Sequence, residues 1–114
     1  MPLIVVNTNL NLEKEKKDSL KSELGRIIEL LPGKTEQQLM VDISDGHTIY
    51  FHGEEAKQTA YIDVRMYGSQ SFESKAEFTS AVFEVAKEQL GLENDEVFVN
   101  IGEYGIWGAR GALK

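Results

Sequence analysis

The sequence contains no cysteine. Disulfide bonds, thiolate nucleophiles, Cys-x-x-Cys redox motifs and thiolate metal sites are therefore excluded. Its apolar runs, such as residues 3–6, are too short to cross a bilayer, and no basic segment followed by an apolar one marks a signal peptide. We therefore expect a cytoplasmic protein with no membrane partner. Secretion by a route that needs no signal peptide stays open.

Basic residues are scarce as well. The chain has 12 lysines and arginines against 19 aspartates and glutamates, which gives a formal net charge of -7. This balance, with lysines scattered among glutamates, disfavours a surface that follows nucleic-acid phosphates, so we expect no nucleic-acid partner. A chain of 114 residues that is 41% hydrophobic can bury a core, and residues 1–114 are most simply one domain.

The first half of the chain alternates between strand-like and helix-like periodicity. A strand, a helix and a second strand are predicted at residues 3–6, 12–31 and 39–43. The helix has its apolar residues at helical spacing: Leu20, Leu24, Ile27, Ile28 and Leu31. Pro32 and Gly33 are expected to end it.

The second half repeats this plan. Residues 48–51 are short and β-prone, and a loop is predicted over 53–57. A strand, a helix and a strand then follow at 61–66, 72–90 and 97–101. The apolar face of this second helix is expected to comprise Phe72, Ala76, Phe78, Val82, Val85, Ala86 and Leu90. Gly91 is expected to end it.

The two halves superpose without a gap at a constant shift of 58 residues, which takes Gly33 to Gly91 and Ile4 to Ile62. This internal repeat covers about residues 2–44 and 60–102 and predicts two tandem β-α-β units. Because a helical crossover joins parallel strands, we expect an α+β fold: a four-stranded mixed sheet with both helices on one face. Apolar residues on the other face would be covered in a homo-oligomer.

Pro2 stands at the start of the first predicted strand, where a missing N–H is tolerated. Removal of Met1 would turn its nitrogen into a secondary amine, and a dry pocket would bring the pKa of that amine towards neutrality, so that it could act as a base. If Met1 is retained, the nitrogen is an amide and has no basic lone pair. Position alone favours a simpler interpretation, in which Pro2 only starts a strand.

Four stretches of the sequence occur together in one known family. They are the opening Met-Pro-Leu-Ile-Val-Val-Asn-Thr-Asn, Leu-Pro-Gly-Lys at 31–34, Tyr-Gly at 67–68, and Asn-Asp-Glu-Val-Phe-Val-Asn at 94–100. With them, nearly the whole chain resembles the macrophage migration inhibitory factor family of the tautomerase superfamily, which includes phenylpyruvate and D-dopachrome tautomerases. The resemblance implies a homotrimer with interfacial active sites. It also implies keto-enol tautomerisation of aromatic 2-oxo acids such as phenylpyruvate, without a cofactor.

The resemblance also implies roles for single residues. Pro2 matches the catalytic proline and would be the general base, and Lys34 matches the cation beside it. Tyr67 matches the residue whose backbone amide receives the substrate carboxylate. Asn100 matches a pocket asparagine that the neighbouring subunit contributes. Without the family, Lys34 would be a solvated lysine near a helix end, and Asn100 a polar residue on an edge strand or facing a pore.

Several positions depart from the family pattern. Phe98 stands where the family often has tyrosine, which keeps the pocket wall but removes a hydrogen bond, so we expect lower or differently selective activity. Tyr67 replaces an aliphatic side chain and would narrow or polarise the mouth. Trp107 would lie at the pocket rim, although the segment before it is shorter than in the animal proteins and the tail after it diverges.

Three other functions stay open. His47 and His52, with Asp42 and Asp45, could form a metal site. Arg65 resembles the arginines with which other superfamily members bind acidic substrates for dehalogenation or decarboxylation. The third is a non-catalytic, cytokine-like protein whose trimer surface binds a protein receptor.

Overall fold

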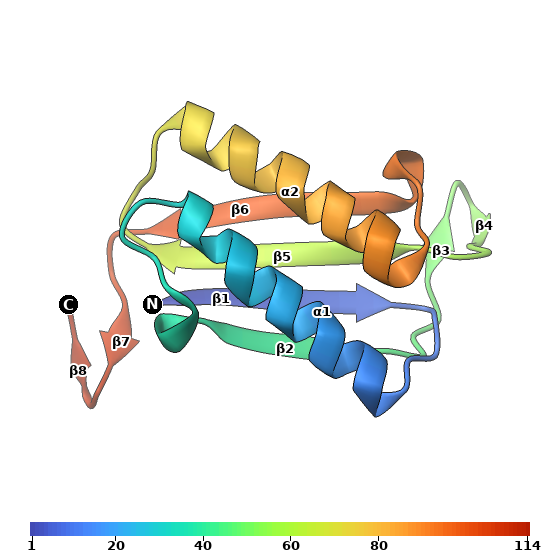
Figure 1. Cartoon of the computed structure of the whole chain (residues 1–114), viewed down its shortest axis with the longest axis horizontal. Helices are drawn as coiled ribbons and strands as arrows, with labels where there is room; N and C mark the ends of the chain where they lie inside the picture. Colours follow the sequence, from blue (N-terminus) through green and yellow to red (C-terminus); the bar gives the residue numbers. More distant parts are fainter.

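Four strands form one mixed sheet in the computed structural model, which describes all of residues 1–114 (Figure 1). They are β1 (Pro2–Thr8), β2 (Met40–Ser44), β5 (Ala60–Tyr67) and β6 (Val97–Tyr104). Their order across the sheet is β2-β1-β5-β6. The central pair β1 and β5 is antiparallel, whereas β1 with β2 and β5 with β6 are parallel. The predicted mixed α+β sheet is therefore confirmed.

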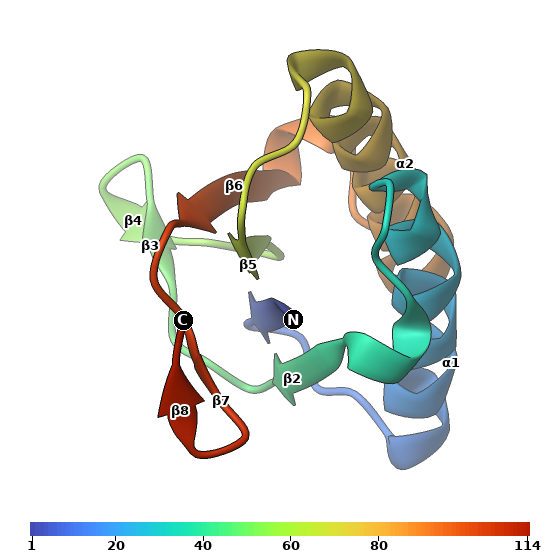
Figure 2. The same ribbon diagram turned by 90° about the vertical axis from the view of Figure 1, so that its left-hand side faces the viewer.

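Two helices cross the same face of this sheet (Figures 1 and 2). Helix α1 (Lys14–Ile27) continues into a 3-10 turn at Ile28–Leu30, and α2 (Phe72–Leu90) connects β5 to β6. The chain leaves both helices through a glycine with positive φ, 83° at Gly33 and 68° at Gly91, where a side chain would be strained. Neither helix is long and apolar enough to span a membrane.

The core lies between the helices and the sheet and contains 17 buried apolar residues. On β1 and β5 every second residue is buried, as a strand with one covered face requires. Phe78 is the largest fully buried side chain. Phe72, which was predicted on the apolar face of α2, is instead 78% exposed, because it is the first residue of the helix and the buried stripe begins only at Phe78. Ala76 also precedes this buried stripe and is exposed.

The opposite face of the sheet is uncovered and more polar than the sequence predicted. Its large exposed apolar side chains include Met40, Tyr61, Phe98 and Tyr104, three of which belong to the edge strands β2 and β6. On β5 the alternation that buries Ile62 and Val64 places Asp63 and Arg65 on this uncovered face, where they form an ion pair of 2.8 Å. The centre of this face therefore combines an ion pair with the half-buried Leu3 and Val5 of β1, and most of its large exposed apolar side chains lie on the edge strands.

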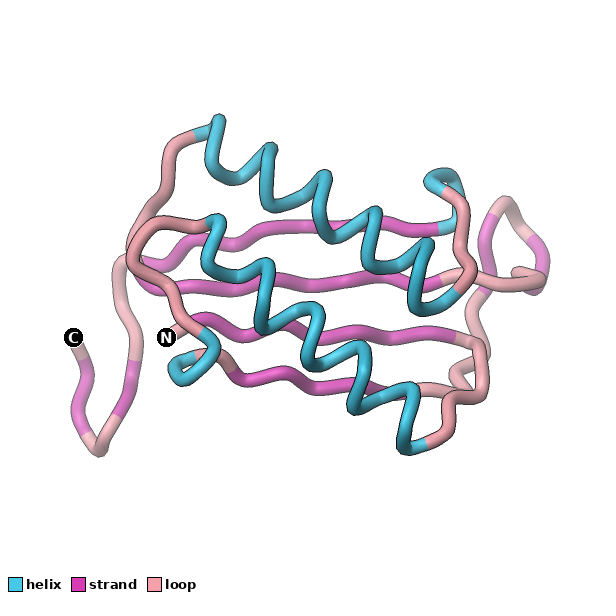
Figure 3. Tube along the Cα trace, viewed as in Figure 1, coloured by secondary structure: helices cyan, strands magenta, loops and turns pink.

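The two β-α-β units pair their strands in the same register. Leu3 of β1 pairs with Met40 of β2, and Tyr61 of β5 pairs with Phe98 of β6, so the partners are 37 residues apart in both units. Figure 3 shows the resulting similarity of the two strand-helix-strand paths. Equal registers mean that residues related by the 58-residue shift occupy equivalent places in the two units.

One set of polar contacts ties the start of α1 to the end of β2. Asp45 Oδ2 accepts a hydrogen bond of 2.8 Å from the backbone N–H of Leu12, and its other oxygen lies 3.0 Å from Lys17 Nζ. The pKa of the Asp45 carboxyl is lowered below its ordinary value, mainly by the hydrogen bond from Leu12 and next by the one from Lys17.

The second unit repeats this arrangement, which we call the acidic clasp. Glu103 accepts a bond of 2.7 Å from the Gln70 backbone N–H and one of 2.8 Å from Lys75 Nζ. The pKa of the Glu103 carboxyl is also lowered, here mainly by the hydrogen bond from Lys75. The equivalent residues of the two clasps, Leu12 and Gln70, Lys17 and Lys75, and Asp45 and Glu103, are each 58 residues apart.

Two short hairpins complete the fold. Strands β3 (Tyr50–Phe51) and β4 (Glu54–Glu55) form one, and β7 (Gly108–Ala109) and β8 (Ala112–Leu113) form the other. The predicted loop at 53–57 is therefore wrong at Glu54–Glu55. Strands of two residues have no periodicity to detect, and the β7–β8 hairpin was not predicted.

Candidate active site

The start of β1 places the N-terminus between two neighbouring strands. Pro2 is the first residue of β1, is buried, and pairs with Met66 of β5. On the other side β2 begins at Met40, which pairs with Leu3. Met1 lies just outside and is 39% exposed. An amine at this point is therefore close to groups from both flanking strands and is partly removed from water.

Lys34 reaches the same place from the end of the first helix. After Gly33 the chain turns, and Lys34 Nζ donates a hydrogen bond of 3.2 Å to the backbone carbonyl of Tyr67. Tyr67 is the last residue of β5 and directly follows Met66, the partner of Pro2. Three of the predicted site residues, Pro2, Lys34 and Tyr67, therefore come together at one end of the sheet.

The electrostatics of this cluster favour a neutral amine. The pKa of the Met1 amine is lowered from its ordinary value, first by partial burial and then by the positive charges of Lys34 and Lys114. Removal of Met1 would move the free amine one residue inward, to the buried Pro2. The same lysines and a drier position would then lower the pKa of the proline nitrogen.

A cavity of about 490 Å³ adjoins Pro2 on its β2 side. Leu39 and Met40 form part of its wall, and Trp107 and Arg110 reach it from the segment that carries the β7–β8 hairpin. Figure 2 shows that this hairpin lies beside the N-terminus at the same end of the sheet. Trp107, which was predicted to lie at a pocket rim, therefore borders a cavity next to Pro2.

Three residues near this cavity were not predicted from the sequence: Tyr104, Arg110 and Lys114. Lys114 Nζ lies 5.0 Å from the centre of the Tyr67 ring, and the Tyr104 ring lies 5.9 Å from that of Trp107. The signal available in the sequence was the pair Arg110-Gly111 between two short segments, because a glycine in second place suits a two-residue hairpin turn. In the structure both residues have the positive φ that such a turn requires. That hairpin brings the end of the chain to the site.

Phe98 and Asn100 do not join this cluster within one chain. The strand registers place Glu103 in the row of Pro2 and Met66, so Phe98 lies five residues further along β6, roughly 17 Å away along the strand. Phe98 is 51% exposed, and its ring lies edge-on to Phe51 at 5.1 Å. Asn100, in the amide orientation that its neighbours favour, donates to Asp63 Oδ1 at 3.0 Å. Their roles in a pocket stay predictions.

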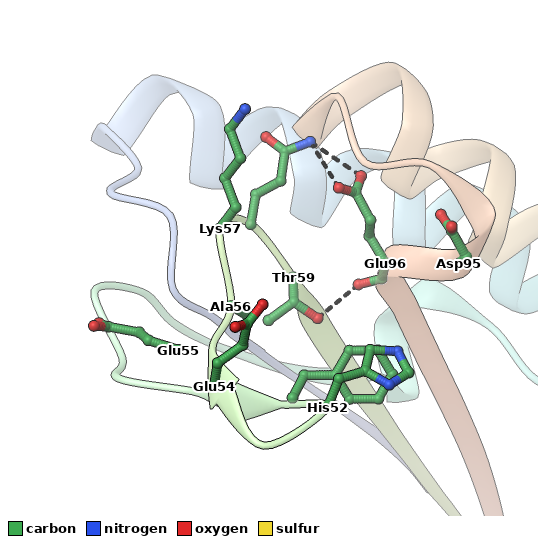
Figure 4. Close-up of a pocket in the computed structure, with 10 residues that line it drawn as sticks. His52, Glu54, Glu55, Ala56, Lys57, Thr59, Asp95 and Glu96 are labelled. Atoms are coloured by element: carbon green, nitrogen blue, oxygen red, sulfur yellow. Dashed lines mark hydrogen bonds between the residues drawn. The ribbon is translucent and has the colours of Figure 1, made fainter.

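The residues of the metal hypothesis do not assemble into a ligand set. His52 lies at a second cavity of about 230 Å³, together with Glu54, Asp95 and Glu96 (Figure 4). The Glu96 carboxylate there accepts hydrogen bonds from the Gln58 amide at 3.0 and 3.2 Å. No three histidine, aspartate or glutamate side chains in the structure come close enough together to hold a metal ion.

Arg65, the residue of the dehalogenase or decarboxylase hypothesis, is already paired. Its guanidinium binds Asp63 Oδ2 through Nε at 3.0 Å and through Nη2 at 2.8 Å. These contacts with Asp63 are also the largest causes that raise the pKa of the guanidinium. No observation in the structure favours a substrate-binding role for Arg65.

Comparisons with known proteins agree with this fold. The family model described as macrophage migration inhibitory factor (MIF) matches residues 1–108. In structure the chain is similar to Leishmania major MIF2, with a TM-score of 0.90, 23% identity, and coverage of 100% of this chain and 97% of that one. No curated protein matches the sequence significantly.

Two further solved structures are similar. A macrophage migration inhibitory factor homologue from Prochlorococcus marinus has a TM-score of 0.84 at 22% identity, with 97% of each chain covered. The protein Pt0534, solved after inactivation by 2-oxo-3-pentynoate, has a TM-score of 0.84 at 17% identity, with 96% of this chain and 93% of that one covered. Likeness at these identities establishes the fold alone.

Proposed function

This chain belongs to the macrophage migration inhibitory factor family, and from that membership we propose that it is a cofactor-independent tautomerase with Pro2 as its general base. The proposal requires removal of Met1, which frees the proline nitrogen. It rests above all on the bond of 3.2 Å by which the Tyr67 carbonyl holds Lys34 next to the start of β1. Because of this bond a cation stands beside the one nitrogen that processing would expose.

The proposed reaction moves one proton between carbon and oxygen of a 2-oxo acid. In the ketonising direction neutral Pro2 takes the proton of the enol hydroxyl and delivers it to C3, and the reverse reaction removes a proton from C3. Lys34 gives one of its three N–H bonds to Tyr67 and retains two for the substrate carboxylate or the developing enolate. The rings of Tyr67 and Trp107 offer an aromatic wall for phenylpyruvate.

The inactivator of one structural neighbour supports the class of substrate. Pt0534 is inactivated by 2-oxo-3-pentynoate, a 2-oxo acid whose alkyne is conjugated to the ketone. Such an alkyne accepts addition of a neutral amine. A site that binds 2-oxo acids next to a neutral Pro2 would be expected to form a covalent adduct with this compound.

We also propose that three copies of the chain assemble, so that each pocket takes Phe98 and Asn100 from a neighbour. Within one chain these residues are far from Pro2 along the sheet, and Phe98 is half exposed. The uncovered apolar margin at Met40 and Tyr104 would gain cover in such an assembly. Light scattering of the purified protein should give the mass of a trimer, and a monodisperse monomer would contradict this proposal.

The decisive experiment uses protein whose intact mass shows that Met1 is absent. We expect this form to ketonise the phenylpyruvate enol, and Pro2→Gly to reduce kcat/KM by about 100-fold or more. Peptide mass spectrometry should place a 2-oxo-3-pentynoate adduct on Pro2. Undiminished turnover in Pro2→Gly would exclude the proline mechanism. Processed protein with neither turnover nor adduct would instead favour the non-catalytic binding function.

A further inference from the structure

Three positively charged side chains without an anionic partner gather at the candidate site of a protein whose net charge is -7. Seven of the twelve lysines and arginines form ion pairs with carboxylates. Of the five that do not, three are Lys34, Arg110 and Lys114. All three lie near the start of β1. A local excess of positive charge in an acidic protein attracts anionic ligands.

These cations flank Pro2 from two sides. Lys34 and Lys114 both contact Tyr67, one at its carbonyl and the other 5.0 Å from the centre of its ring, so they approach from the β5 side. Arg110 lines the cavity on the β2 side, together with Leu39 and Met40. Because β1 lies between β2 and β5, the two groups of cations stand on either side of its first residue.

The cavity beside Arg110 contains no opposing charge. Its other polar lining side chains are the amides of Gln37 and Gln38 and the indole of Trp107, and no aspartate or glutamate lines it. Its volume of about 490 Å³ lies within the range of roughly 300 to 1,000 Å³ that is usual for small-molecule sites. A guanidinium that lines a cavity without anionic side chains is suited to bind a carboxylate through two parallel N–H donors.

One hairpin holds both of the new cations in place. The backbone N–H and carbonyl groups of Trp107 and Lys114 bond to each other at 2.9 and 3.0 Å and close its base. Its turn consists of Arg110 and Gly111, with φ of 54° and 82°. The same element therefore presents Lys114 to Tyr67 at its base and Arg110 to the cavity at its tip.

We propose that the site prefers 2-oxo acids that carry a second carboxylate, and that Arg110 binds that second carboxylate. This inference rests on the proposed function, since it assigns the 2-oxo carboxylate to Lys34 and Lys114. Phenylpyruvate has a single negative charge and would leave Arg110 without a partner. The preferred substrate class is therefore a 2-oxo dicarboxylate, which bridges the cations on both sides of Pro2.

A matched pair of ligands tests this preference directly. The five-carbon acids 2-oxoglutarate and 2-oxopentanoate differ only in their last group, a carboxylate in one and a methyl in the other. Calorimetry on the processed protein should show that 2-oxoglutarate binds about tenfold more tightly or better. Exchange of the C3 protons in D2O, followed by NMR, reports proton transfer on the same two compounds.

Substitutions at position 110 assign the preference to the guanidinium. Arg110→Asn removes the charge and suits the positive φ of the turn, and we expect it to abolish most of the preference while 2-oxopentanoate binding changes less than about twofold. Arg110→Lys should retain part of the preference. Lys16→Gln removes an exposed, unpaired charge of α1 and should change neither affinity.

The possible results separate the two proposals. Equal affinities for the two acids would overturn the dicarboxylate inference. So would a preference that Arg110→Asn leaves intact, or one that Lys16→Gln weakens as much as Arg110→Asn does. If the C3 protons of 2-oxopentanoate exchange but 2-oxoglutarate binds no more tightly, the dicarboxylate inference is overturned and the tautomerase proposal stands. A preference that depends on Arg110, without C3 exchange, would support the dicarboxylate site and count against Pro2 as the base.

Discussion

The two β-α-β units have equivalent backbones, but only the first carries the candidate site. Under the 58-residue shift, Pro2 corresponds to Ala60 and Lys34 to Leu92. Ala60 and Leu92 are each only 1% exposed and belong to the apolar core. The positions that we propose to supply a base and a cation in the first unit thus contribute only packing in the second.

The acidic clasp shows the opposite behaviour. Asp45 and Glu103 make the same pair of contacts in both units, with a backbone N–H ahead of the helix and with a lysine of the helix. Contacts that build the fold are therefore repeated, and those that would carry chemistry are not. A free amine can occur only in the first unit, because β5 begins in the middle of the chain.

Positions 34 and 92 are equivalent, and giving each the residue of the other tests how the units differ. We expect the larger loss of stability when position 92 of the second unit receives the lysine. Leu92→Lys places an ammonium group at a position that is 1% exposed and has no anionic partner. We expect the free energy of unfolding to fall by about 3 kcal/mol or more. Urea denaturation measures this loss, with Leu92→Met as the control, which should cost less than about 1.5 kcal/mol. A near-normal midpoint for Leu92→Lys would show that this position is less enclosed than the structure indicates.

The reciprocal change should spare stability and impair activity. Lys34→Leu removes the cation that Tyr67 holds, and we expect kcat/KM for the phenylpyruvate enol to fall by about 10- to 100-fold. The free energy of unfolding should change by less than about 1 kcal/mol, since the lost bond is a single partly exposed one. Wild-type kcat/KM in Lys34→Leu would remove Lys34 from the mechanism.

The pH dependence of the reaction should report the same cations. Only the neutral amine is a base, so kcat/KM should rise with pH through the pKa of the amine and then level off. Partial burial, Lys34 and Lys114 lower the pKa of the Met1 amine, and we expect the same causes to act on the Pro2 amine once Met1 is removed. Loss of either lysine should therefore shift the rise to higher pH. Lys114→Leu should shift it less than Lys34→Leu, and Lys16→Leu should not shift it. A shift to lower pH in either site variant would contradict this electrostatic account.

The smallest expected effects concern the two clasps. The pKa values of Asp45 and Glu103 are lowered in the folded protein from 3.8 and 4.5, so each carboxylate stabilises the fold above these values. That contribution is lost as the pH falls through the lower folded-state pKa. Asp45→Asn and Glu103→Gln should each lower the urea midpoint slightly, and by similar amounts, at about pH 7, and the difference from wild type should shrink as the pH falls through the folded-state pKa. Clearly unequal losses would show that the two clasps are not equivalent.

Local pattern was sufficient to predict the sheet. The alternation that buries Ile4, Val6, Ile62 and Val64 and the helical spacing that buries Leu20 and Leu24 are properties of nearby residues, and the 58-residue shift related one half to the other. With parallel strands in each unit, those patterns leave few ways to place both helices. The sequence also indicated Pro2 and Lys34, although only through family resemblance.

The neighbourhood of Pro2 depends on contacts between distant parts of the chain. Lys34 and Tyr67 are joined by a side-chain bond to a backbone carbonyl across 33 residues, and such a bond leaves no periodic signal. Arg110 and Lys114 reach the site because a hairpin with two-residue strands folds back beside the other end of the chain. Periodicity predicts which side of an element is buried. The tertiary structure is needed to place Lys34 and the two cations near the end of the chain, Arg110 and Lys114, around the nitrogen of Pro2.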